Sequence, residues 1–93
     1  MVKKAVRVYI KGIVQGVFFK KFVKKNAEEL GVNGYARNIE DGNTFEAWFE
    51  GDGEKVDQLI EKCKKGPEHA VVKRLDIVEE KFQGRKGFKI ISF

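Results

Sequence analysis

Several residue types that often carry chemistry are almost missing from this chain of 93 residues. One cysteine, Cys63, cannot form an internal disulfide, which agrees with a reducing compartment. A Ser-His-Asp arrangement has almost nothing to be built from, because the chain has one serine, one threonine and one histidine: Ser92, Thr44 and His69. One histidine and one cysteine cannot supply a zinc site, and no carboxylate cluster suggests a magnesium cage. We therefore expect no metal and no cofactor.

Long apolar runs are also missing. No stretch approaches the ~18 residues needed to span a membrane, and the first residues lack the continuous apolar run of a signal peptide. Length and a hydrophobic content of 42% favour one globular domain over residues 1–93. We expect a cytoplasmic monomer with no membrane partner.

Acidic residues are missing from residues 1–27, which contain eight Lys or Arg. The other 66 residues carry 11 basic and 14 acidic side chains, so their net charge is −3. The net charge of the whole chain is +5. This N-terminal quarter is electropositive and suited to attracting an anion. The alternative is an ordinary solvated basic face.

The residue pattern predicts alternating strands and helices. Alternation of β-branched and polar residues predicts a strand over 5–11, ended by Gly12, and a loop over 13–19 follows. After this loop the apolar residues recur with the spacing of a helix, so we expect an amphipathic helix from about Lys20 to Leu30. Later patterns predict strands over 33–39 and 44–50 around an Asp41-Gly42 turn, a helix over 54–65, and strands over 71–80 and 88–92.

The order is βαββαβ with a terminal strand. Two amphipathic helices can cover one face of an antiparallel sheet. We therefore expect an α+β fold, a ferredoxin-like sandwich with a short extra C-terminal strand. Cys63 falls on the apolar stripe of the second helix and is expected to be a core residue. His69 follows Pro67 in a loop, and we give it little weight as a catalytic residue.

Residues 12–20, Gly-Ile-Val-Gln-Gly-Val-Phe-Phe-Lys, connect the first strand to the first helix. A loop in this place can turn successive backbone N–H groups inward as an anion-binding nest at the positive end of the helix dipole. Gly16 tolerates the backbone angles of such a curl, and Lys20 can place its ammonium on the same anion. A purely structural loop is the alternative, since glycine-containing connections are common.

Two motifs resemble those of the acylphosphatase family. Residues 12–20 are similar to the signature Gly-x-Val-Gln-Gly-Val-x-Phe-Arg, except at the last position. Residues 34–42, Gly-Tyr-Ala-Arg-Asn-Ile-Glu-Asp-Gly, are similar to a second signature, Gly-Tyr/Trp-x-x-Asn-x-x-Asp-Gly. Two motifs in register are far more specific than one glycine pattern. The resemblance covers essentially the whole chain.

The resemblance implies a ferredoxin-like enzyme that hydrolyses acyl phosphates to carboxylate and inorganic phosphate without metal or cofactor. It implies a phosphate cradle of backbone amides and two catalytic residues, Lys20 and Asn38, of which Asn38 would orient the attacking water. The implied substrate-binding residues are Gln15, Gly16, Val17, Phe18, Phe19 and Lys20. An acyl phosphate has a good leaving group, so holding the phosphoryl group and aiming a water can suffice.

Lys20 departs from the family pattern, which has Arg. Lys offers a mobile point charge in place of a planar bidentate fork, so we expect reduced activity. Lys21 should point elsewhere on the helix, and strand alternation places Arg37 on the face opposite Asn38.

Two other interpretations remain open. A non-catalytic anion- or RNA-binding ferredoxin-like module shares the element order, although the expected aromatic RNA-stacking signature is absent from residues 45–49. The acylphosphatase-like domain of a carbamoyl-transferring hydrogenase-maturation protein carries similar signatures, but we expect a stand-alone enzyme. The expected partner is a small acyl phosphate or inorganic phosphate, and nucleic acid is not expected.

Overall fold

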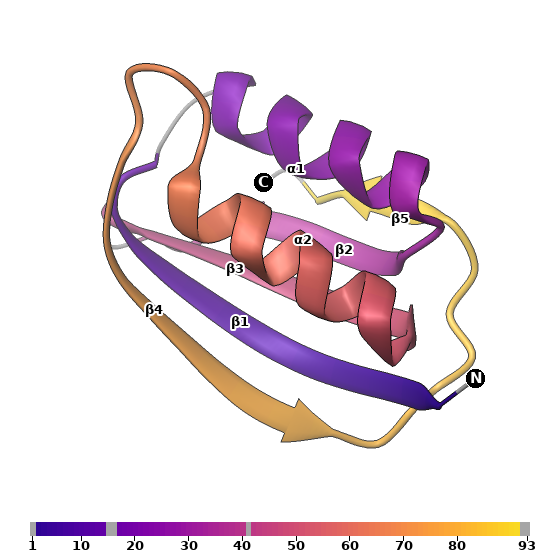
Figure 1. Ribbon diagram of the computed structural model, residues 1–93. Helices are drawn as coiled ribbons and strands as arrows, with labels where there is room; N and C mark the ends of the chain where they lie inside the picture. Colours follow the sequence, from indigo (N-terminus) through magenta and orange to yellow (C-terminus); the bar gives the residue numbers. More distant parts are fainter. Residues whose placement is uncertain (1, 15–16, 41, 92–93) are drawn as a thin grey trace.

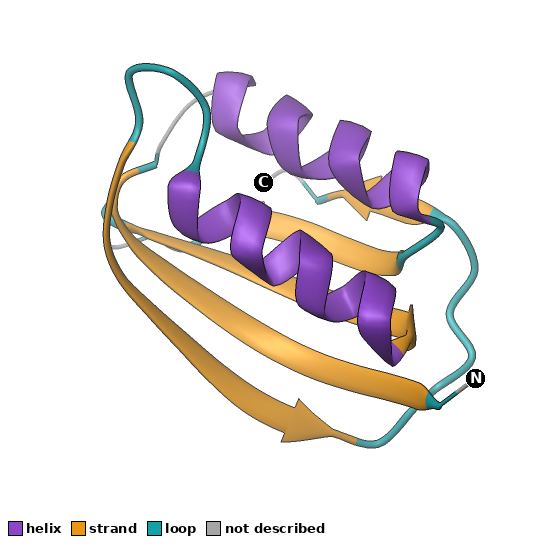
Figure 2. Cartoon of the chain, in the orientation of Figure 1, coloured by secondary structure: helices purple, strands orange, loops and turns teal. Residues whose placement is uncertain are grey.

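The computed structural model describes residues 2–14, 17–40 and 42–91. Gln15, Gly16, Asp41 and Ser92 therefore lie outside the described residues, and with them parts of the predicted nest, hairpin turn and last strand. Seven elements follow one another along the chain (Figures 1 and 2). They are β1 (Lys3–Ile13), α1 (Val17–Leu30), β2 (Asn33–Asn38), β3 (Thr44–Asp52), α2 (Gly53–Lys65), β4 (Val71–Glu80) and β5 (Phe88–Ile90).

The strands form one sheet in the order β4-β1-β3-β2-β5, and both helices lie over one face of it (Figure 1). The pairs of β1 with β3 and β4, and of β2 with β3, are antiparallel. The predicted α+β ferredoxin-like sandwich is confirmed. One detail differs, because β5 lies parallel to β2 and makes the sheet mixed at that edge. Strand alternation carries no information on the direction of the neighbouring strand, so the sequence pattern could not show this.

The core lies between the sheet and the helices. Val6, Val8 and Ile10 of β1 are fully buried, as are Phe45, Ala47 and Phe49, which are their register partners on β3. The apolar stripes of both helices cover this layer, and Cys63 is among their buried residues, as predicted. Burial of this continuous apolar layer is the main term that stabilises the fold.

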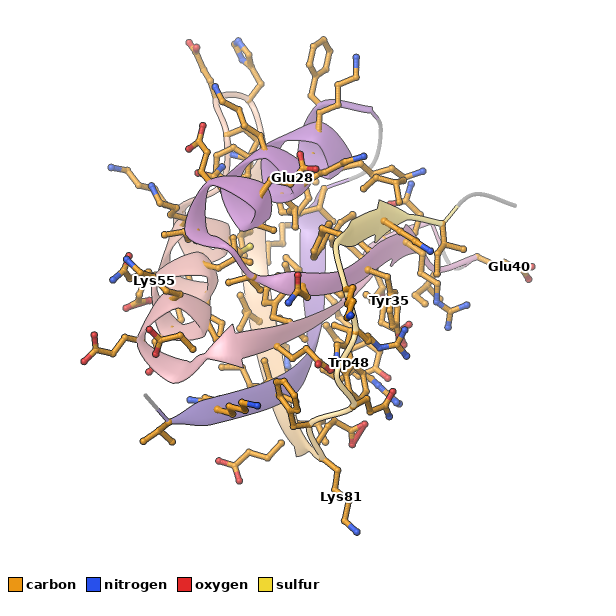
Figure 3. The ribbon with its side chains drawn as sticks, turned by 90° about the vertical axis from the view of Figure 1, so that its right-hand side faces the viewer. Glu28, Tyr35, Glu40, Trp48, Lys55 and Lys81 are labelled. Carbon is orange, nitrogen blue, oxygen red and sulfur yellow. The ribbon has the colours of Figure 1, made fainter. Side chains whose placement is uncertain are left out.

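The opposite face of the sheet is covered as well. Trp48 and Tyr35 project from it on the side away from the helices (Figure 3), yet Trp48 is only 1% exposed. The guanidinium groups of Arg7 and Arg85 lie over the Trp48 ring at 5.5 and 5.0 Å. Alternation along β3 places Trp48 on the face opposite to Phe45, Ala47 and Phe49. It did not predict that the segment joining β4 to β5 would cover Trp48 and Tyr35.

The first helix begins earlier than expected. The predicted loop over 13–19 is wrong at its end, because α1 starts at Val17 and β1 continues to Ile13. The physical reason is the burial of Phe19, whose ring packs edge-on against Phe45 at 4.9 Å between centroids. That contact outweighs the absence of a helix-start signal in the sequence. No helix among the described residues is long and apolar enough to cross a membrane.

Candidate functional site

Three connections meet at one end of the molecule. Lys11 of β1 pairs with Thr44 of β3, and Asn38 of β2 pairs with Phe45, so the end of β1, the end of β2 and the start of β3 lie together. The start of α1 follows β1 at this end, and the segment between α2 and β4 also arrives there (Figure 1). We call this the loop end of the molecule.

Gly12 allows β1 to approach β4 closely at the loop end. Its φ is +140°, and a Cβ placed on it would lie 2.0 Å from the carbonyl oxygen of Val71. The register between β1 and β4 shifts between Lys11 and Gly12, which marks a bulge. Only glycine fits this position, so the first glycine of the motif directs the chain out of the sheet and toward α1.

The start of α1 offers hydrogen-bond donors to an anion. The first four N–H groups of an α-helix have no acceptor within the helix, and here they belong to residues 17–20. The first turn contains no acidic side chain that would occupy them. The helix dipole adds a partial positive charge at this end. The predicted substrate-binding residues Val17, Phe18, Phe19 and Lys20 are therefore the opening turn of the helix.

Lys20 lies on one flank of that turn. Phe19 points into the core toward Phe45, and each following residue turns by about 100° around the helix axis. The half-buried Lys20 consequently faces sideways, on the flank of α1 that lies toward β2 and β5. Lys21 is exposed and points elsewhere, as predicted. The ammonium of Lys20 can reach an anion held by the N–H groups of its own turn.

Asn38 lies at the end of β2, beneath the first turn of α1. Its register partner Phe45 contacts Phe19, and directly opposed residues of two antiparallel strands share a face. Asn38 therefore faces the helices. Its Oδ1 is buried and has no hydrogen-bond partner among the described residues. Arg7 Nε, on the other face of the sheet, is the second such atom among these residues. Such groups are rare in folded proteins, and a bound water is one of the partners that can satisfy them.

Arg37 points the other way, as the alternation predicted. Its Nε donates to Oε1 of Glu46 at 2.7 Å on the face away from the helices. The hydroxyl of Tyr35 donates to the same carboxylate oxygen at 3.3 Å. Arg37 therefore cannot take the place of the arginine that the first motif lacks.

A groove opens beside the site, and the sequence reasoning missed it. It has a volume of about 540 Å³ and lies between the first turns of α1 and the segment between α2 and β4. Its apolar walls come from Ile13, Phe18, Phe22, Pro67 and Ala70. Phe18 is 85% exposed and Ile13 is 62% exposed. Two large exposed apolar residues flanking the predicted phosphate loop were the available signal for it.

The sequence offered two further candidates for chemistry, Cys63 and His69. Burial raises the pKa of Cys63 to about 12, so this thiol is not a nucleophile near neutral pH. His69 lies in the segment after α2, where it lines the groove with its side chain largely in solvent. No group of three or more His, Cys, Asp or Glu within the described ranges could hold a metal ion.

The fold and the loop end together define a class: an α+β sandwich with a helix N-terminus, a lysine of the first helical turn and a strand asparagine at one end. Comparison with family models matches residues 6–90 to the acylphosphatase family. An acylphosphatase of Syntrophus aciditrophicus (strain SB) is 48% identical over 89 residues, which are 95% of this chain and 92% of the relative. This chain belongs to the acylphosphatase family.

Solved structures agree with this assignment. The crystal structure of acylphosphatase from Bacillus subtilis matches with a TM-score of 0.89 at 28% identity, over 95% of this chain and 98% of that one. HypF of T. kodakarensis matches with a TM-score of 0.83 at 33% identity, over 97% of this chain but 12% of HypF. These findings support an enzyme of the acylphosphatase type and do not favour the RNA-binding alternative.

Proposed function

We propose that this protein hydrolyses acyl phosphates to a carboxylate and inorganic phosphate, with Lys20 and Asn38 as its catalytic residues. The observation that carries the proposal is the buried Oδ1 of Asn38, which lies beneath the first turn of α1 and has no hydrogen-bond partner within residues 2–14, 17–40 and 42–91. A water that donates to this oxygen would stand next to an anion held by the helix N-terminus. The family assignment supplies the chemical class of that anion.

The reaction follows from this arrangement. Backbone N–H groups of residues 15–20 and the Lys20 ammonium hold the phosphoryl oxygens and balance the charge that develops on them. Asn38 accepts a hydrogen bond from the attacking water and directs its oxygen at phosphorus. The new P–O bond forms as the bond to the acyl oxygen breaks, and the carboxylate leaves with that electron pair. The proton lost by the water passes to a phosphate oxygen or to solvent.

No general base is needed for this sequence of events. A carboxylate departs easily, so positioning and charge compensation supply the rate. The chemistry of the groups at the loop end fits this requirement, because an amide and a lysine keep their charge through the reaction. Lysine holds phosphate with a point charge, where arginine would use a bidentate fork. We infer that turnover is lower than with arginine at residue 20.

The test is phosphate release from acetyl phosphate and benzoyl phosphate with a chelator present. Asn38→Ala should lower kcat by about 100- to 1,000-fold, because the water loses its acceptor. Lys20→Arg should raise kcat/KM by about 10- to 150-fold, equal to one charge-assisted hydrogen bond gained in the transition state.

Matched controls exist on the same helix. Asn26 donates to the carbonyl oxygen of Phe22 within α1, and Lys24 lies one turn after Lys20. Asn26→Ala and Lys24→Arg should leave kcat within about twofold of the parent, since neither side chain lies in the first turn. Full activity in Asn38→Ala, or no gain in Lys20→Arg, would remove these two residues from the mechanism.

A further inference from the structure

The apolar groove lies on the flank of α1 opposite to Asn38. Phe18 and Phe22 line it from α1, and Pro67 and Ala70 line it from the segment between α2 and β4. That segment leads into β4, at one edge of the sheet, whereas β2 lies next to the other edge. The N-terminus of α1, where the phosphoryl group would sit, lies between the groove and Asn38.

This placement matches the geometry of the proposed reaction. In an in-line displacement, the attacking water and the leaving group stand on opposite sides of phosphorus. If Asn38 directs the water from the side of β2, the leaving carboxylate departs on the side of the groove. The acyl group is attached to that carboxylate, so it points into the groove.

The groove also suits an apolar guest. Most of its lining is apolar, and Lys21, Lys25, Glu68 and His69 are the polar residues among those that line it. A volume of about 540 Å³ lies within the ordinary range of small-molecule sites. Phe18 keeps 85% of its surface in water in the free protein, so covering it with a hydrocarbon group is favourable.

We propose that the groove beside α1 is the acyl-binding subsite, and that it selects acyl phosphates with an aromatic or extended aliphatic acyl group over acetyl phosphate. The inference rests on the proposed function, because it takes the phosphoryl group to be bound at the start of α1. It adds the part of the substrate that the groove recognises. Phe18 joins the two subsites, with its backbone amide in the opening turn of α1 and its side chain in the wall of the groove.

The experiment compares kcat/KM for hexanoyl phosphate and acetyl phosphate. Both release an unactivated aliphatic carboxylate, so their ratio reports binding of the longer chain. We expect the parent protein to prefer hexanoyl phosphate by about 10-fold or more, since each buried methylene contributes several-fold. A ratio near one would overturn the inference and leave the proposed function standing. Failure to hydrolyse either compound would overturn both.

Two variants locate the preference in the groove. Ile13→Ser removes an apolar wall, and Ala70→Leu fills part of the space. Each should lower the hexanoyl-to-acetyl ratio of kcat/KM by about threefold to tenfold, because the longer acyl chain loses its contacts in the groove. Ile77→Ser is the matched control, because Ile77 is a similarly exposed isoleucine of β4 outside the groove. An equal change in the ratio for Ile77→Ser, or an unchanged ratio in both groove variants, would contradict the assignment.

Discussion

Glu46 shows how one residue is kept ionised in a nearly buried position. Its side chain is 6% exposed, and burial alone would raise its pKa. The hydrogen bonds from Arg37, Tyr9 and Tyr35 prevail and lower the pKa below its ordinary value. Burial and the neighbouring carboxylate raise the pKa of Tyr35. The carboxylate thus holds the Arg37 side chain on the outer face of the sheet, opposite to the face that carries Asn38.

Replacing Glu46 by glutamine should destabilise the protein in a pH-dependent way. Because the folded pKa is lowered, the carboxylate contributes stability above its ordinary pKa of 4.5 and loses that contribution as pH falls through the folded value. We expect a loss of about 1–2 kcal/mol at pH 7, discounted for the partly exposed Arg37. Urea unfolding of Glu46→Gln and the parent from pH 7 to pH 3 measures this difference.

The difference between the two proteins should shrink below pH 4.5. Glu61→Gln is the control, because Glu61 pairs with Lys64 on the exposed face of α2 and both side chains are more than half exposed. This variant should change stability by less than about 0.5 kcal/mol at any pH. A Glu46→Gln defect that persists unchanged at pH 3 would show that packing, and not the ionised carboxylate, is responsible.

At the scale of elements, the segment over residues 81–87 closes the outer face of the sheet. Glu50 of β3 is fully buried and accepts hydrogen bonds from Trp48 Nε1 at 2.8 Å, from the Gln83 amide at 3.2 Å and from the Arg85 amide at 2.8 Å. The guanidinium of Arg85 also lies over the Tyr35 and Trp48 rings. One carboxylate therefore ties this segment to the central strand of the sheet.

Glu50→Gln should loosen this segment and destabilise the fold. The amide nitrogen of glutamine would face one of the three N–H donors that the carboxylate now satisfies. We expect a loss of about 2–3 kcal/mol in the free energy of unfolding and faster hydrogen exchange at the amides of Gln83 and Arg85. Glu79→Gln on exposed β4 is the control and should change neither quantity. Unaltered exchange at Gln83 and Arg85 in Glu50→Gln would contradict the role of Glu50.

The elements also show what a sequence pattern can and cannot predict. Alternation in β1 and β3 and the helical stripe ending at Cys63 are local signals, and each predicted its element within a few residues. The parallel pairing of β5 with β2 and the hydrogen bonds from Gln83 and Arg85 to Glu50 join residues more than 30 positions apart in the chain. No local repeat of apolar and polar residues predicts these long-range contacts. The groove could not be predicted from the sequence for the same reason, because Ile13 and Ala70 come together only in the folded chain.

The candidate site was more predictable than the groove. The opening turn of α1 and Asn38 lie within two compact motifs, and strand alternation alone separates Asn38 from Arg37. The antiparallel pairing of β2 with β3 determines the end of the sheet at which Asn38 lies. The unpaired state of Oδ1 required coordinates, because it depends on every atom around Asn38.

Over the whole molecule, which extends 34 Å along its longest axis, lysines gather at the loop end and carboxylates at the other end. Both ends carry both signs, since Glu40 and Glu68 lie at the loop end and Lys3 and Lys55 at the other. At the loop end are the lysines of the first half of α1, Lys11, and the last turn of α2 with Lys62, Lys64 and Lys65. At the other end lie Glu28 and Glu29, Glu54 and Asp57 at the start of α2, and Glu79 and Glu80 at the end of β4. Of the basic N-terminal quarter, Lys4 and Arg7 are paired away from the site, with Asp57 and Glu80.

This division should attract an anionic substrate to the loop end, and salt should weaken the attraction. Raising sodium chloride from about 20 to 200 mM should lower kcat/KM for acetyl phosphate by about threefold to tenfold. Lys24→Gln and Lys55→Gln remove the same charge at different distances from the loop end: Lys24 lies one turn after Lys20, whereas Lys55 lies in the first turn of α2, which begins where α1 finishes (Figure 1). The ends are separated by more than the ~10 Å over which charges act at 0.1 M salt. At low salt, Lys24→Gln should therefore lower kcat/KM about twofold and Lys55→Gln should leave it unchanged. Equal effects of the two variants would mean that net charge, and not its placement at the loop end, governs capture of the substrate.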